Sequence, residues 1–133
     1  MRTGLDTSVV LRLLIGEPAD QADRAWRFIL QERSEGREIV VSDLVISEAY
    51  FALQYHYDVP KGEALQQLGR LVDSGQIVAN GCAAAVLRIP RLASAKPGFV
   101  DRLIHEGYMC DADRVATFEL AAKKLQRSIV LPP

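Results

Sequence analysis

The chain has 133 residues, of which 49% are hydrophobic and 25% charged, and its formal net charge is −1. The length allows one domain, over residues 1–133; the composition excludes a disordered chain, and the near-neutral charge excludes a protein that holds nucleic acid by overall charge alone. No apolar stretch approaches the roughly 20 residues of a transmembrane helix, and Asp6 stands where a signal peptide would be apolar, so we expect a cytoplasmic protein without a membrane partner.

Short β-branched runs alternate with longer helical patterns, which is typical of an α/β domain built on a mostly parallel sheet. The elements expected in the first half are a strand over 2–5, helices over 7–14 and 19–35, a strand over 39–41 and a helix over 43–57. Gly16 and Pro18 end the first of these helices, and Ser42 is the expected N-cap of the helix that starts at residue 43.

Pro and Gly residues divide the rest of the chain into shorter elements. A helix enters at Pro60 and ends at Gly75, and Pro90 must kink or stop a helix over 81–95. The remaining expected elements are a short strand over 77–78, a helix over 99–105, a strand over 114–117, a short helix over 119–126 and a strand over 128–131. We therefore expect one α/β/α domain with a mostly parallel central sheet of four to five strands, whose sites form beyond the carboxyl ends of the strands.

Two acidic residues follow predicted strands directly. Asp6 comes after the first strand, and Glu119 comes after the strand over 114–117 and opens the next short helix. Both therefore stand at the edge of the sheet where ligands bind. The alternative role of Asp6 is to cap the helix that follows it, and the alternative for Glu119 is a surface position favoured by the helix dipole.

Two further acids lie on predicted helices. The neighbours of Glu48 at helical spacing are all apolar: Leu44, Val45, Phe51 and Ala52. This pattern predicts that Glu48 points inward, where a carboxylate needs a cation, a hydrogen-bond network or a raised pKa; the alternative is that it swings out to water. Asp101 lies early in the helix over 99–105, and its alternative role is that of a simple first-turn acid.

The hypothesis that these four acids converge has a physical consequence. Each pair of carboxylates within about 5 Å would repel by roughly 3 kcal/mol at an effective dielectric constant near 20. A hard divalent cation resolves that repulsion, and carboxylates without histidine or cysteine suit Mg²⁺ or Mn²⁺. Such an ion activates water for phosphodiester hydrolysis. His105 lies one turn after Asp101 and could assist or contact a substrate, or it could be an ordinary helix-surface histidine.

Four segments of the chain resemble the motifs of PIN domains of the VapC type. They are Leu5–Leu14, Val41–Ala49, Gly98–Ile104 and Val115–Glu119, and they occur in the order that the family has. The resemblance implies a Mg²⁺-dependent endoribonuclease, the toxin of a type II toxin–antitoxin pair, which forms a homodimer and binds an antitoxin protein. It implies that Asp6, Glu48, Asp101 and Glu119 are the catalytic and metal-binding residues, with Thr7, Ser8 and Thr117 supporting the site.

The chain departs from the family pattern at three positions. Ser8 stands where the family usually has asparagine, Gly98 where it often has an acid, and Glu119 where it usually has aspartate. Asp111 and Asp113 are close enough in sequence to replace the fourth acid. These departures leave an alternative open, a PIN-like module that binds RNA or a partner without cutting. A receiver domain needs two adjacent acids after the first strand and a lysine after a late strand, and a haloacid-dehalogenase-like phosphatase needs a second aspartate two residues after the first. This chain has Asp6 followed by Thr7 and Ser8 and no lysine at the required point, which disfavours both.

Several other residues could contact RNA or protein partners. The basic or polar side chains near the predicted site are Arg12, Arg102, Arg114, Lys123 and His105, and each could also be an ordinary surface residue. The helix over 43–57 carries more aromatic and aliphatic residues than one core face needs. Its tyrosines could therefore form a dimer or antitoxin surface: Tyr50, Tyr55 and Tyr57. Cys82 and Cys110 have no zinc-type spacing with the histidines and are expected to remain thiols.

Overall fold

The computed structural model describes residues 1–133 and has a mixed α/β fold. The first half comprises β1 (Arg2–Gly4), α1 (Thr7–Ile15), α2 (Ala19–Ser34), β2 (Glu38–Val41), α3 (Asp43–Tyr55) and α4 (Lys61–Asp73). The second half comprises β3 (Val78–Ala79), α5 (Ala83–Leu87), the 3-10 helix η1 (Leu92–Ser94), α6 (Phe99–Tyr108), β4 (Val115–Thr117), the 3-10 helix η2 (Leu120–Lys124) and β5 (Ser128–Val130). None of the helices combines the length and apolar composition that crossing a membrane requires.

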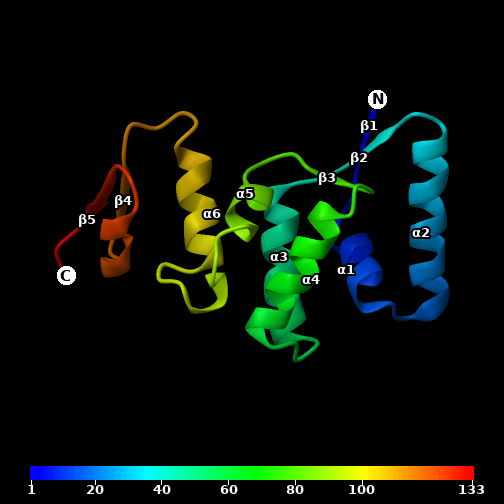
Figure 1. Ribbon diagram of the computed structural model, residues 1–133, viewed down its shortest axis with the longest axis horizontal. Coiled ribbons are helices and arrows are strands. Elements are labelled where there is room, and N and C mark those ends of the chain that lie inside the picture. The colour runs from blue at the N-terminus through cyan, green and yellow to red at the C-terminus, as the bar shows by residue number, and fades with distance from the viewer.

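The five strands form two separate parallel sheets. One sheet has the order β1-β2-β3, with Thr3 paired to Ile39 and Val41 paired to Ala79, and the other consists of β4 and β5 alone. The expected single central sheet of four to five strands is therefore not what this structure shows. Figure 1 shows the reason: α6 lies between the first sheet with its helices and the pair β4-β5, which forms the far end of the molecule.

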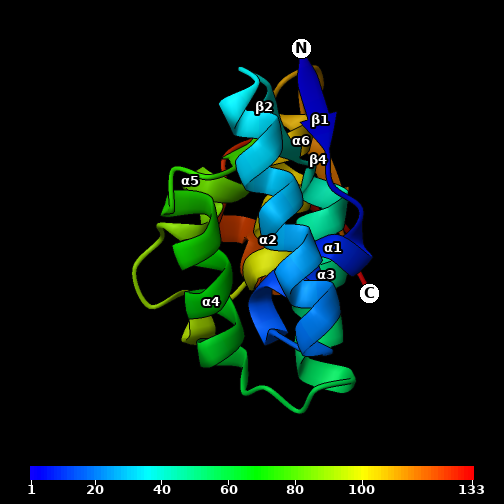
Figure 2. The same ribbon diagram turned by 90° about the vertical axis from the view of Figure 1, so that its right-hand side faces the viewer.

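The core lies between the first sheet and helices α1 to α4. Its completely buried members include Val10, Ile29, Val41, Ile46 and Leu53. Seen from the opposite end (Figure 2), α2 lies in front of α1 and α3, with α4 to one side. The helix α6 joins this core through Phe99 and Leu103, and Phe99 meets Tyr50 of α3 edge to face with ring centroids 5.0 Å apart.

Local capping signals place the helix boundaries. The Asp6 carboxylate accepts from Thr7 N at 2.8 Å and caps α1, and Gly16 ends that helix in the left-handed conformation. The Ser42 hydroxyl accepts from Val45 N at 3.2 Å, which confirms it as the N-cap of α3. Pro90 lies between α5 and η1, so the helix expected over 81–95 is divided into two short pieces.

The start of α5 is anchored to the start of α3 by a polar contact. The sequence pattern does not indicate this contact. The two carboxylate oxygens of Asp43 accept from Cys82 N at 2.9 Å and from Ala83 N at 3.0 Å. They therefore satisfy two of the free N–H groups at the beginning of α5. Gly81 makes this approach possible, because a Cβ built on it would lie 2.5 Å from the Asp43 carboxyl group.

We expect Gly81→Ala to lower the free energy of unfolding by about 1–3 kcal/mol, because the new methyl group displaces a carboxylate that two main-chain donors hold in place. Chemical denaturation followed by circular dichroism measures this change. Gly69→Ala is the matched control: Gly69 lies inside α4, and a Cβ added there would meet no atom within 4 Å, so the same substitution is expected to stabilise the chain by up to about 1 kcal/mol. Equal effects of the two substitutions would contradict the account of Gly81.

Candidate functional site

The first two predicted acids meet at the carboxyl end of β1. Thr7 Oγ1 donates to Glu48 Oε1 at 2.9 Å, a contact between residues 41 positions apart in the chain. Asp6 lies beside this contact, and one of its oxygens caps α1 through Thr7 N while the other accepts no hydrogen bond from the chain. Asp6 and Glu48 are named the first acidic pair, and Thr7 links their two carboxylates. Asp6 thus caps a helix and also belongs to this cluster.

The predicted inward orientation of Glu48 is wrong. Glu48 is exposed, and so are its helical neighbours Leu44 and Phe51, which are 71% and 43% exposed. The helix α3 is apolar on more than one face, and its buried face is formed instead by Ile46, Ala49, Tyr50 and Leu53. Because the Glu48 carboxylate is exposed to water, it needs no cation to compensate for burial.

The other two predicted acids line a second place. Asp101 of α6 and Glu119, the N-cap of η2, border a cavity of about 310 Å³ between α6 and β4 together with His105 and Thr117. Glu119 Oε1 accepts from Ala121 N at 3.2 Å, and Thr117 Oγ1 accepts from Glu119 N at 3.0 Å. Thr117 therefore holds the turn that presents Glu119. Asp101 and Glu119 are named the second acidic pair.

His105 is not the helix-surface residue that the sequence allows. It is 5% exposed and lines the cavity between α6 and the segment of β4 and η2. The hydroxyl of Ser128 on β5 lines the same cavity and is buried with no hydrogen-bond partner. This cavity thus contains one buried hydroxyl group for which the fold provides no partner.

A shallow depression of about 460 Å³ adjoins the second acidic pair. Asp101 and Glu119 line it together with Lys61 and Lys96. The sequence pattern does not indicate these two lysines, because Lys61 reaches the site only through the packing of α4 near η1. Their ammonium groups place positive charge beside the two carboxylates.

The structure does not bring the two acidic pairs together. No hydrogen bond joins them, and no three His, Cys, Asp or Glu side chains come close enough to one another to hold a metal ion. Hard divalent ions such as Mg²⁺ take oxygen ligands in near-octahedral geometry, so a pair of exposed carboxylates supplies only part of such a site. The donor types are those that Mg²⁺ and Mn²⁺ prefer.

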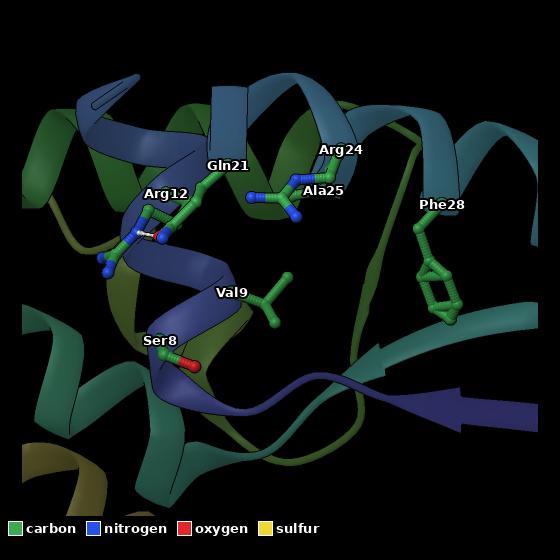
Figure 3. A pocket seen from close by; sticks show the side chains of 7 residues that line it. All are labelled: Ser8, Val9, Arg12, Gln21, Arg24, Ala25 and Phe28. Carbon is green, nitrogen blue, oxygen red and sulfur yellow. Dashed lines mark hydrogen bonds between the residues drawn. The ribbon is translucent and has the colours of Figure 1, made fainter. Parts of the chain in front are cut away.

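A third cavity, of about 450 Å³, lies between α1 and α2 (Figure 3). Ser8 and Arg12 line it from α1, and Gln21, Arg24 and Phe28 line it from α2. Arg12 Nε donates to Gln21 Oε1 at 2.6 Å, so its guanidinium is held without a carboxylate partner. The sequence identified Ser8 and Arg12, whereas the residues from α2 are brought to this cavity only by the packing of the two helices.

Other predicted contact residues have structural roles here. Arg102 Nε donates to the carbonyl oxygen of Pro97 at 2.7 Å and closes the loop that precedes α6. Tyr50 is buried against Phe99 and cannot form a partner surface, whereas Tyr55 and Tyr57 are 76% and 39% exposed. Burial raises the pKa of the Tyr50 hydroxyl.

The remaining acids and thiols lie outside these cavities. Asp111 and Asp113 are exposed in the connection between α6 and β4 and border neither acidic pair. Cys82 and Cys110 are free thiols, and desolvation followed by the nearby Asp43 carboxylate raises the pKa of Cys82. A thiol with a raised pKa is a poor nucleophile, as expected for a structural cysteine.

The chain matches no protein-family model, no curated protein and no solved structure. Its function is therefore inferred from the residues and positions described above.

Proposed function

We propose that this protein is a Mg²⁺- or Mn²⁺-dependent endoribonuclease of the PIN type. The observation that carries the proposal is the hydrogen bond from Thr7 to Glu48, which joins the first and second acidic motifs across 41 positions of sequence. It places two carboxylates and a hydroxyl at the carboxyl end of a parallel strand, where sites of α/β proteins form. The four acids are oxygen donors of the kind that hard divalent ions prefer.

In the cell, the protein acts as a cytoplasmic toxin that an antitoxin inhibits. It rests on the resemblance of the four motifs to VapC-type PIN domains. RNA is the substrate, and a cognate antitoxin protein is the partner that masks the site. Expression of the chain alone should arrest bacterial growth, and co-expression with the product of an adjacent small reading frame should relieve the arrest. Unimpaired growth on expression of soluble protein would contradict the toxin role.

The activity is tested by incubating the purified chain with structured RNAs in Mg²⁺, Mn²⁺ or EDTA. We expect cleavage with either ion, none in EDTA, and none by Asp6→Asn, which keeps an oxygen for the α1 cap but removes the charge. Asp73→Asn is the control, since Asp73 is an exposed acid that pairs with Arg88 and lines neither cavity beside the second acidic pair. Mn²⁺ should also raise the melting temperature of the wild-type chain, because an ion that binds the folded state stabilises it.

A second candidate is a module that binds RNA or a protein without cutting it. The separation of the two acidic pairs favours it, because two carboxylates alone form an incomplete metal site. Its signature would be a stable RNA complex in the presence of Mg²⁺ with the RNA intact. Metal-dependent cleavage that Asp6→Asn abolishes would exclude this candidate.

A further inference from the structure

The cavity between α6 and β4 combines apolar walls with a few polar groups. Its volume is about 310 Å³, which falls within the range of small-molecule sites in proteins. The apolar part of its wall consists of Ile104, Tyr108, Val115, Ala116, Ala122 and Leu125. Ligand pockets usually have this composition, because apolar walls exclude water while a few polar groups orient the ligand.

Two polar groups of this cavity lack a hydrogen-bond partner within the chain. The hydroxyl group of Ser128 on β5 is buried without one. The imidazole of His105 is 5% exposed, and the only side-chain hydrogen bond formed by a residue of α6 comes from Arg102. A buried hydroxyl group without a partner lowers the stability of a fold, so its presence needs an explanation. A bound ligand that supplies the missing partner is such an explanation.

The cavity adjoins the depression that Lys61 and Lys96 line. Asp101 and Glu119 belong to the walls of both, and both side chains are exposed, whereas His105 is buried. The second acidic pair therefore stands at the mouth of the cavity, and the two lysines lie outside it. Carboxylates repel an anionic group, so the part of a ligand that passes them is neutral. An anionic part is favoured outside, beside the ammonium groups.

A nucleotide is divided in the same way. Its base is planar and neutral, with hydrogen-bonding groups along its edge, and its phosphate is anionic. Proteins recognise unpaired RNA bases by packing side chains on the base and by hydrogen bonds to its edge. Phosphates are bound by basic side chains. The cavity therefore matches the base, and the depression matches the phosphate.

We propose that the cavity and the depression together bind one unpaired nucleotide of an RNA. The base enters the cavity, where the Ser128 hydroxyl and the His105 imidazole form hydrogen bonds with its edge. The phosphate lies beside Lys61 and Lys96. The binding of a nucleotide rests on this geometry alone, whereas its consequence, selection of the cleaved sequence by the bound base, rests on the proposed function.

The cavity between α1 and α2 fits a nucleotide less well. Its two arginines already have partners, since Arg12 bonds to Gln21 and Arg24 bonds to Asp20. None of the residues that line it has a buried polar atom without a hydrogen bond. The fold thus satisfies the polar groups of that cavity, whereas it leaves the Ser128 hydroxyl unsatisfied.

Nuclear magnetic resonance titrations in EDTA test the binding without metal or cleavage. The probes are the common ribonucleoside monophosphates, the corresponding nucleosides and inorganic phosphate, each added to the isotope-labelled wild-type chain. We expect at least one monophosphate to shift the resonances of His105 and Ser128 until they saturate. Its nucleoside should bind more weakly, and inorganic phosphate alone should leave these two resonances unchanged.

Ser128→Ala separates a binding role from a structural one. Loss of an unpartnered hydroxyl group should leave the melting temperature unchanged or raise it, while the affinity for the nucleotide falls about 3- to 10-fold, the effect of one hydrogen bond. Ser34→Ala is the matched control: Ser34 is exposed on α2 and lines none of the cavities described above. This control should bind the nucleotide as the wild-type chain does.

Two further variants distinguish the base from the phosphate. His105→Phe keeps a ring in the buried position, and we expect it to weaken the nucleoside and the monophosphate by a similar factor. Replacement of Lys61 and Lys96 by glutamine should weaken the monophosphate alone. Circular dichroism checks that each variant is folded.

Two results would overturn the proposal. One is a folded wild-type chain in which no nucleotide at millimolar concentration shifts the His105 and Ser128 resonances, which would leave an ordered water as the partner of the hydroxyl group. The other is binding that Ser128→Ala and His105→Phe both leave unchanged, which would place the nucleotide elsewhere. Nucleotide binding by a chain that cleaves no RNA would contradict the proposed function and support this inference, and cleavage without nucleotide binding would do the reverse.

Discussion

Glu48→Gln is expected to reduce metal-dependent RNA cleavage by at least about 100-fold, because loss of a metal ligand exceeds the 10- to 100-fold effects of the groups that support ligands. Glutamine keeps the length of the side chain and an oxygen that can accept from the Thr7 hydroxyl. The substitution removes one negative charge from the first acidic pair, so the free energy of unfolding should stay constant or rise slightly. Single-turnover cleavage in Mn²⁺ and thermal denaturation measure the two effects.

Two variants make the Glu48 result specific. Thr7→Val removes the hydrogen bond but keeps both carboxylates, and we expect a loss of about 10-fold, as for a residue that positions a ligand. Glu63→Gln changes an exposed acid in the first turn of α4 and should leave cleavage unchanged. Full activity in Glu48→Gln would show that this carboxylate does not bind the ion.

Phe99→Ala is expected to lower the free energy of unfolding by about 3–5 kcal/mol, which is the cost of deleting a buried aromatic ring. Phe99 is 2% exposed, and its edge-to-face contact with Tyr50 joins α6 to α3. Its loss should loosen α6, which carries Asp101 and His105. Urea denaturation measures the effect on stability, and hydrogen exchange of the α6 amides measures the loosening.

Phe28→Ala is the matched control for Phe99. Phe28 lies on α2 and is 42% exposed, so its removal should cost less than about 1 kcal/mol. A similar loss of stability in the two variants would show that the contact between Phe99 and Tyr50 does not anchor α6.

Local signals placed most of the helices and strands correctly. The cap at Ser42, the left-handed Gly16 and the break at Pro90 act over only a few residues, so they can be read without knowledge of the fold. The periodicity also identified α6, although that helix continues to Tyr108 beyond the expected end at His105. The position of Asp6 after a strand and the order of the motifs predict that Asp6 lies near Glu48. The hydrogen bond from Thr7 to Glu48 is consistent with that prediction.

Other features depend on contacts between distant segments. Glu48 was expected to be buried because its neighbours are apolar, yet α3 has more apolar residues than one face can bury, and packing selected the face with Ile46 and Leu53. The sequence leaves open whether His105 contacts a substrate or lies at the helix surface, and the packing of α6 buries it beside the cavity that β4 and η2 also line. A helix pattern shows which residues share a face and does not show which face a later segment will cover.

The amino-acid sequence by itself determined the order of helices and strands, their caps and the four acidic positions, because these depend on interactions within one or two turns of chain. Only the tertiary structure decided that the strands divide into two sheets, that the acids form two pairs and that Asp43 anchors α5 across Gly81. The physical reason is that strand partners and cavity walls are chosen by burial and main-chain hydrogen bonding between segments far apart in the chain.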